Sequence, residues 1–208
     1  PSAVELVDRT MIDLARDIPL FAGTVDRFVQ GEPQALLLVE FSGEEQADPA
    51  HSLSHLVELV ESLGSENSVV EATDNEFQKA IWEVRKSGLN IMMSMKGDGK
   101  PVSYIEDCAV DLKDLAEYTR RVSEVFHKHG TTGTFYAHAS VGCLHVRPIL
   151  NMKEASGAQK MRAIVEETLE IVREYKGSHS VVHGDGLSRS EFHLPMFGQR
   201  LVNSFELL

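Results

Sequence analysis

The sequence predicts an α+β fold in which an antiparallel or mixed sheet carries helices on one face. Three observations support this expectation. Several segments repeat apolar residues at helical spacing, and short runs rich in β-branched and aromatic residues lie between them, with few such runs joined directly. The stretch 131–150 is also rich in such residues and contains Gly142 near its centre, which predicts two strands that meet at a tight bend.

The composition is that of one globular domain. The chain has 208 residues, of which 42% are apolar and 25% charged. No apolar run approaches the ~18 residues of a membrane span. The net charge is −12, with no cluster of lysine and arginine, so we expect no binding to nucleic acid.

Cysteine usage and the first residue bear on the origin of the chain. Cys108 and Cys143 are the two cysteines, which excludes a disulfide framework and a zinc ribbon and is typical of a reducing cytoplasm. The chain starts at Pro1 and opens with neither a signal-peptide nor a lipidation pattern. We therefore expect it to begin inside a longer polypeptide.

The first half of the chain starts with a predicted helix over 3–15, because Val4, Val7, Met11 and Leu14 form one stripe. The nearly continuous apolar run 34–41 suits a central strand. The next predicted segments are a loop at 44–49, a helix at 53–63 and a short strand at 69–72.

A helix start follows at Thr73, which forms a capping-box pattern with Glu76. Residues 88–100 are rich in Met, Gly and Asp and are predicted to be a mobile excursion. The remaining predicted segments are a strand at 101–107, a helix from Asp111 to Gly130, the hairpin at 131–150, a helix at 161–172, a strand at 180–183 and a final helix.

Two histidines flank the predicted bend. His138 and His145 lie seven residues apart, and a second polar cluster follows at His183, Gly184 and Asp185. Because paired strands bring distant residues side by side, the two imidazoles can converge on one point. Imidazole binds zinc, iron and similar metals and titrates nearest neutral pH. The alternative is two strand histidines satisfied by hydrogen bonds.

Two segments resemble the C-terminal domain of FAD-linked oxidases. They are Ala-His-Ala-Ser-Val-Gly-Cys-Leu-His-Val-Arg-Pro-Ile-Leu at 137–150 and His-Gly-Asp-Gly-Leu-Ser-Arg-Ser-Glu-Phe at 183–192. The segments 81–86 and 104–110 also look like family motifs, so the resemblance runs through most of the chain. The family includes D-lactate dehydrogenases, glycolate oxidase flavoprotein subunits and D-2-hydroxyglutarate dehydrogenases. The sequence at 144–150 resembles most closely that of long bacterial members that carry a C-terminal iron-sulfur domain.

The resemblance implies that 1–208 is a single ferredoxin-like cap domain, which binds substrate in an FAD-dependent 2-hydroxy acid dehydrogenase or oxidase. It implies as partners a small 2-hydroxy acid of the lactate, glycolate or 2-hydroxyglutarate type, an upstream FAD-binding domain and a downstream iron-sulfur domain. Because the chain has no glycine-rich phosphate cradle, we expect the upstream domain to hold most of the FAD and the chain alone to be inactive. The expected location is the cytoplasm, at the inner face of the membrane where partners bring the protein there.

The resemblance also implies residue roles. His183 matches a histidine suited to be the catalytic base, and His138 and His145 match catalytic metal ligands for zinc, iron or manganese. Relatives carry a glutamate before the base, but this chain has Val182, which cannot coordinate a metal.

Two alternatives follow from Val182. Either another carboxylate substitutes as the third ligand, with Asp185, Glu106 and Asp107 as candidates, or the histidines act on the substrate without a metal. A protein that has lost its metal ligand can also be a non-catalytic ligand-binding or interaction domain that retains the fold.

The substrate carboxylate needs a fixed cation. Arg85 matches the substrate-binding arginine of the family, and Arg147 is a second candidate because it lies two residues beyond His145 on the same strand. A surface salt bridge is the alternative for each arginine. His183, Gly184 and Arg189 are the expected contacts to the flavin, although Arg189 can equally face solvent.

Overall fold

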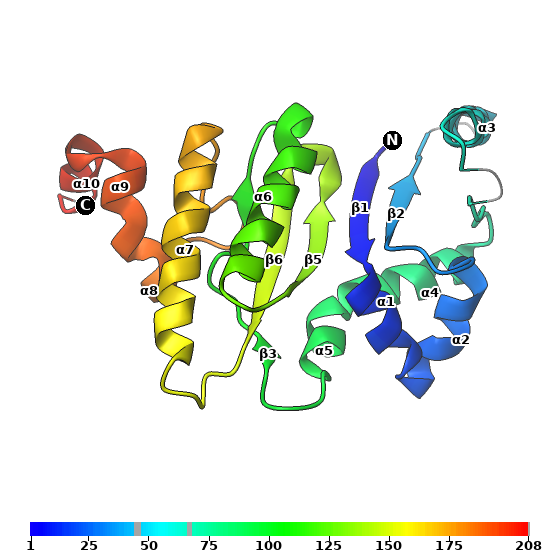
Figure 1. The fold of residues 1–208 in the computed structure, drawn as a ribbon. Coiled ribbons are helices and arrows are strands. Elements are labelled where there is room, and N and C mark those ends of the chain that lie inside the picture. Colours follow the sequence, from blue (N-terminus) through cyan, green and yellow to red (C-terminus); the bar gives the residue numbers. More distant parts are fainter. Residues whose placement is uncertain (44–46, 66–67, 208) are drawn as a thin grey trace. The chain divides into compact units, whose positions relative to one another are not determined.

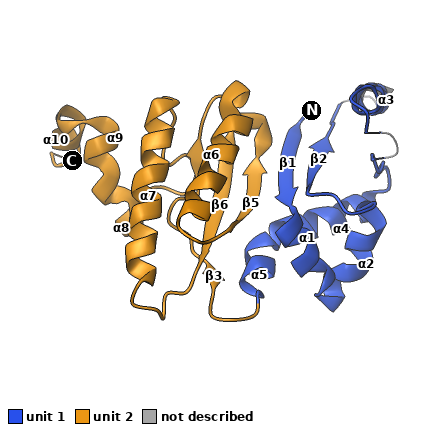
Figure 2. Cartoon of the chain, in the orientation of Figure 1, with its two compact units in different colours: residues 1–95 blue, residues 96–208 orange. Residues whose placement is uncertain are grey.

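The structure is a computed structural model that describes residues 1–43, 47–65 and 68–207. The chain divides into two compact units, residues 1–95 and residues 96–208 (Figure 2). Within each unit the described strand pairs are antiparallel and are combined with helices. The predicted α+β class is therefore confirmed.

The first unit begins with a strand pair. Strand β1 (Ala3–Asp8) runs antiparallel to β2 (Ala35–Glu40), and helix α1 (Arg9–Arg16) follows β1 directly. The carboxylate of Asp8 accepts the Met11 N–H at 2.8 Å and so caps the helix. The predicted helix over 3–15 is wrong in its first half. Glu5 and Val7 are both buried, which is the alternation of a strand.

The other helices of this unit differ from the predictions in several places, and the helix at 19–28 was not predicted. The predicted start at Thr73 is nearly right, because Asp74 is the cap and its carboxylate accepts the Phe77 N–H at 2.8 Å. The predicted excursion at 88–100 begins with a helix, and the predicted strand at 69–72 is not formed. Of the predicted loop at 44–49, residues 44–46 lie outside the described residues and the rest belongs to a helix. These helices are α2 (Pro19–Phe28), α3 (Ala47–Ser62), α4 (Asn75–Lys86) and α5 (Gly88–Met93).

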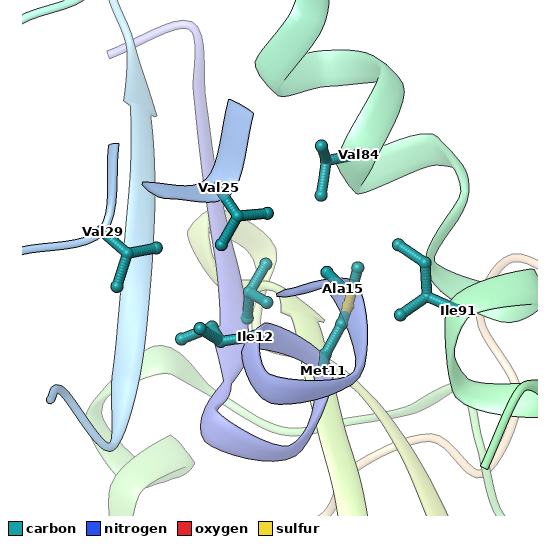
Figure 3. Packing of buried hydrophobic residues seen from close by; sticks show 8 residues of the cluster. Met11, Ile12, Ala15, Val25, Val29, Val84 and Ile91 are labelled. Atoms are coloured by element: carbon teal, nitrogen blue, oxygen red, sulfur yellow. The ribbon is translucent and has the colours of Figure 1, made fainter. Parts of the chain in front are cut away.

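An apolar core holds the helices of the first unit together (Figure 3). Met11 and Ile12 of α1 pack in one cluster with Val25 of α2, Val84 of α4 and Ile91 of α5. Each fully buried side chain of this size contributes roughly 1.5–3 kcal/mol relative to an exposed one. The core fixes α4, which also carries Arg85.

The second unit is built around the predicted hairpin. Strand β5 (Gly133–His138) pairs antiparallel with β6 (Cys143–Leu150), which places Tyr136 opposite His145. Strand β3 (Lys100–Pro101) pairs with the end of β6 and β4 (Cys108–Ala109) with its start. Only the first residue of the predicted strand at 101–107 lies in a strand.

The bend of the hairpin requires glycine. The short helix η2 (Ala139–Val141) ends at Gly142, whose φ is +70°. A Cβ at this position would lie 2.1 Å from the carbonyl oxygen of Val110. Both the backbone conformation and the close approach therefore exclude a larger side chain, as the predicted bend requires.

Two long helices cover one face of the β5 and β6 pair (Figure 1). Helix α6 (Leu115–Lys128) follows the short helix η1 (Leu112–Asp114) and packs beside α7 (Gly157–Glu174). Short helices close the chain. They are α8 (Gly186–Arg189), η3 (Ser190–Phe192), α9 (His193–Phe197) and α10 (Gln199–Phe205).

Residues 180–183, predicted as a strand, form no strand, and 181–183 form bends. Cys108 and Cys143 are both buried free thiols. Among the described helices, none has the length and apolar character needed to cross a bilayer.

Candidate active site

His145 lies at the centre of a cluster of rings in the second unit. It is 1% exposed on β6. The ring of His183 stacks on it with centroids 5.0 Å apart and planes inclined by 23°. The ring of His138 meets it edge-on at 4.8 Å, and Tyr136 lies 4.8 Å away on β5. The structure therefore brings together the three histidines that the sequence singled out.

The environment of His145 keeps its imidazole neutral. Burial, together with the neighbouring His138 and His183, lowers the pKa of His145 from 6.5 to about 4. Its Nδ1 is buried and has no hydrogen-bond partner among the described residues. A neutral imidazole has one N–H and one lone pair, so His145 retains hydrogen-bonding capacity that the protein does not use.

The loop that carries His183 is wrapped around Asp107. The fully buried Asp107 carboxylate accepts the main-chain N–H groups of Val181 at 2.9 Å, Val182 at 3.0 Å and His183 at 2.8 Å. These bonds replace the strand predicted at 180–183, because the N–H groups converge on a carboxylate instead of a neighbouring strand. Burial alone would raise the pKa of Asp107, but the three N–H groups outweigh it and hold the pKa below its usual value.

Glu106 connects Arg147 to His183. Arg147 donates from Nε to Oε2 of Glu106 at 2.6 Å, and Nη2 of Arg147 lies 2.5 Å from the same oxygen. The other oxygen, Oε1, lies 3.5 Å from Nδ1 of His183. Burial raises the pKa of Glu106, but a hydrogen bond from Ser103 and the charge of Arg147 outweigh it, so the pKa is lowered. The ionised carboxylate orients His183 with Nε2 on the far side of the ring.

Both arginines of this unit's site are buried. Arg189 donates to the main-chain carbonyls of Glu106, at 2.8 Å, and Gly184. It therefore ties the two ends of the site together. Arg147 keeps its Nη1 buried without a hydrogen-bond partner among the described residues. This nitrogen is a charged donor without an acceptor among the described residues.

The residues around His138 and His145 do not complete the metal site that the resemblance implies. Position 182 contributes its N–H to Asp107 and, as valine, no ligand. Within the described part of the chain, one group of ligating side chains includes His145, with Asp107 and Cys143. Both oxygens of Asp107 already accept main-chain N–H groups there. Of the carboxylates considered as substitutes, Asp107 is the one that groups with His145, and Glu106 is paired with Arg147.

Arg85 and Asp185 lie in other surroundings. Arg85 belongs to the first unit, where Nη2 and Nε lie 2.5 Å and 3.1 Å from Oε2 of Glu5. Both side chains of this pair are 11% exposed. Asp185 groups with His179 and His193.

With this geometry in view, comparisons with known proteins identify the family. The family model described as FAD linked oxidases, C-terminal domain, matches residues 1–206. The chain belongs to this family. The resemblance drawn from the motifs is therefore confirmed.

Several relatives are known by name. The chain is 26% identical to a D-2-hydroxyglutarate dehydrogenase of Pantoea ananatis, over 97% of the chain and 20% of that protein. It is 27% identical to the Escherichia coli protein of the same name, over 96% of the chain and 20% of that protein. A glycolate oxidase subunit GlcD of Bacillus subtilis is 23% identical over 76% of the chain and 33% of that protein. The chain thus spans about a fifth of the length of the first of these relatives.

Three residues of the second unit were not singled out by the sequence analysis. Tyr136 contacts His145 across the hairpin, and its place opposite His145 follows from the register once the bend is fixed at Gly142. His179 and His193 lie six residues before and eight residues after Asp185. The signal available for them was only the local density of histidine.

Proposed function

We propose that this chain forms the substrate-binding wall of an FAD-dependent dehydrogenase or oxidase of small 2-hydroxy acids. The observation that carries the proposal is the single cluster that contains the stacked His145 and His183 rings, the Glu106 carboxylate and the Arg147 guanidinium. It unites a base, a neutral imidazole and a cation. Membership in the FAD-linked oxidase family and relatives named for two 2-hydroxy acid enzymes support the same reaction class.

His183 is the proposed base. The substrate hydroxyl proton moves to Nε2 of His183 as the hydride leaves C2, and Glu106 near Nδ1 stabilises the resulting imidazolium. The side chain of His183 is 42% exposed, so a substrate can reach it. A positioned base of this kind contributes about 10²- to 10⁴-fold to a rate.

His145 is the proposed partner of the substrate oxygen. Its ring is neutral near pH 7 and stacks on the base, and its Nδ1 has no partner among the described residues. A hydrogen bond between the substrate and this ring would hold the hydroxyl beside His183. His138, which meets His145 edge-on, would set the angle of the ring.

Arg147 is the proposed contact to the substrate carboxylate, through its free Nη1. The two bonds to Glu106 fix the guanidinium, so little side-chain entropy is lost when an anion binds. Arg85 remains the second proposed contact. In the first unit it is already oriented by Glu5.

FAD, when bound, supplies the hydride acceptor for this reaction. We assign the flavin contacts of this chain to His183 and Gly184, which are exposed, with Arg189 holding the Gly184 carbonyl beneath them. An FAD-binding domain upstream, an iron-sulfur domain downstream and a cytoplasmic location complete the proposal. No step is assigned to a metal at His138 and His145. Metal analysis of the protein with and without His138→Ala tests that separate prediction.

The test of the proposed base is His183→Ala in the full-length flavoprotein. We expect flavin reduction by lactate, glycolate or 2-hydroxyglutarate to slow by at least about 100-fold, with the flavin still bound. His127→Ala, at an exposed position on α6, is the matched control and should leave the rate unchanged. Unchanged flavin reduction in His183→Ala would rule out the base.

Val182 favours one competing function, a non-catalytic domain that binds a ligand or a partner protein. Such a domain would bind a 2-hydroxy acid without reducing flavin. Unmutated full-length protein that binds these acids but leaves its flavin oxidised would support this second function over the first.

A further inference from the structure

We infer that His179, Asp185 and His193 form a binding site for a divalent cation of the zinc type, separate from the cluster around His145. The site does not depend on the proposed oxidation of 2-hydroxy acids. Its ligands come from the two ends of the loop that carries His183 and from helix α9.

The geometry of the three side chains fits one small ion. Nε2 of His179 lies 3.1 Å from Oδ1 of Asp185, and Nε2 of His193 is hydrogen-bonded to Oδ2 at 2.7 Å. One ligand atom from each residue lies within 4.8 Å of the other two. Zinc bonds of about 2.0–2.2 Å place two tetrahedral ligands roughly 3.3 Å apart. Shifts of the three side chains that bring their ligand atoms to this spacing would seat the ion.

Apart from the contacts within this group, its ligand atoms have no hydrogen-bond partner among the described residues. His179 is 1% exposed, and neither of its ring nitrogens makes a hydrogen bond among the described residues. Oδ1 of Asp185 is also buried and makes no hydrogen bond there. Buried polar atoms are nearly always satisfied by protein, water or an ion. The Nε2 and Oδ1 atoms lie 3.1 Å apart without a hydrogen bond, and a shared cation would satisfy both.

The charges also favour a cation. Among the described residues, Asp185 forms ion pairs with the two histidines, and the nearby Arg189 donates instead to the carbonyls of Glu106 and Gly184. Two imidazoles and one carboxylate are a ligand set typical of zinc sites that keep a fourth position for water. The side chains of Asp185 and His193 are 25% and 23% exposed, which leaves access for the ion and that water.

Aromatic rings surround the site. Phe197 lies 5.3 Å from the His179 ring, and Phe205 lies 5.6 Å from the His193 ring. These rings limit access of water and strengthen the attraction between the carboxylate and a cation. They also come from α9 and α10, so an ion here ties the last helices to the loop at 180–184.

The bound ion would hold the loop that presents His183. His179 precedes this loop and Asp185 follows it, while Asp107 binds its main-chain N–H groups from inside. The cation would thus hold the two ends of a loop whose central main chain is already bound by Asp107. This is a structural role, in which the ion touches no substrate.

The test measures zinc binding by the full-length protein after treatment with a chelator. We expect one equivalent of zinc that depends on this site, and in His193→Gln its affinity should fall by at least about tenfold. His129→Gln is the matched control, because His129 also faces a carboxylate, Glu167 at 2.7 Å, but no third ligating side chain joins them among the described residues. It should retain the zinc, as should the double variant His138→Gln with His145→Gln.

Two further measurements separate loss of the ion from loss of folding. Cobalt in place of zinc should give the visible absorption of a four-coordinate ion, lost in both Asp185→Asn and His193→Gln while α-helical circular dichroism persists. Zinc should also slow amide exchange at 180–184. No zinc in the unmutated protein, zinc retained in His193→Gln, or zinc lost only with His138 and His145 would each overturn the site. Flavin reduction in His183→Ala is decided independently of these results.

Discussion

The main-chain N–H of His183 donates to the buried carboxylate of Asp107 over 2.8 Å. Two preceding N–H groups of the loop donate to the same carboxylate. Asp107 has a φ of +81°, a conformation that aspartate tolerates better than most residues. The position of the proposed base thus depends on one ionised side chain 76 residues earlier in the chain.

Asp107→Asn removes this charge while keeping the size of the side chain. The amide NH₂ group would face N–H donors, so we expect the free energy of unfolding to fall by about 2–4 kcal/mol. Urea unfolding of the chain measures this. Asp111→Asn is the control, because Asp111 is exposed and caps η1 through the Lys113 N–H. Its cost should stay below about 1 kcal/mol, and equal costs for the two variants would contradict the role of Asp107.

Gly142→Ala tests the bend between His138 and His145. The new Cβ would meet the carbonyl oxygen of Val110 at 2.1 Å, in a backbone with φ of +70°. We expect a loss of about 3–5 kcal/mol in the free energy of unfolding, from overpacking and backbone strain together.

Gly184→Ala is the matched comparison for this bend. Gly184 has a similar φ of +72°, but a Cβ there meets nothing within 4 Å. Only the conformational cost of about 1–2 kcal/mol should appear. If the two alanine variants unfold at the same urea concentration, the close contact at Gly142 is not what excludes a side chain.

Local patterns predicted the parts of the fold that depend on neighbouring residues. The hairpin, Gly142 at its bend and the start of α4 follow from periodicity and turn chemistry within a few residues. The helix predicted over 3–15 was wrong at its start because Val4 and Val7 are compatible with a strand as well as with a helical stripe. Only the pairing of β1 with β2 decides between the two.

Local patterns predicted less of the candidate site than of the fold. The motifs indicated His138, His145 and His183, and the structure brings them together. The supporting contacts were not predictable, because Glu106 reaches Arg147 and Asp107 reaches 180–183 across long separations in the chain. Their pairing depends on the folded sheet. No short motif encodes it.

Arg147→Lys tests the proposed contact to the substrate carboxylate. Lysine can keep an ion pair with Glu106 but has no planar fork, so it cannot hold Glu106 and present a second donor in the same geometry. We expect KM for 2-hydroxy acids to rise by about 10- to 100-fold, with a smaller change in kcat. Steady-state kinetics of the full-length enzyme measure this. A change in kcat alone would place Arg147 in support of Glu106 and not on the substrate.

The pH dependence of stability tests the neutral state of His145. The unfolded chain binds a proton at His145 below about pH 6.5, whereas the folded protein does not until about pH 4. The free energy of unfolding should therefore fall as the pH is lowered between these values, by up to about 3 kcal/mol from this residue. Burial also lowers the pKa of His179, so His179 adds to the loss in the same direction.

The lowered pKa values of Glu106 and Asp107 affect the free energy of unfolding only at lower pH. Their ordinary values are 4.5 and 3.8, so the stability that they contribute is present above these values and is lost only below them. Urea unfolding between pH 4.5 and 6.5, with a chelator present, thus isolates the histidines. In His145→Gln the slope should become shallower but remain positive because His179 still titrates. The exposed His127→Gln should keep the original slope, and an unchanged slope in His145→Gln would show that the buried imidazole is not held neutral by the fold.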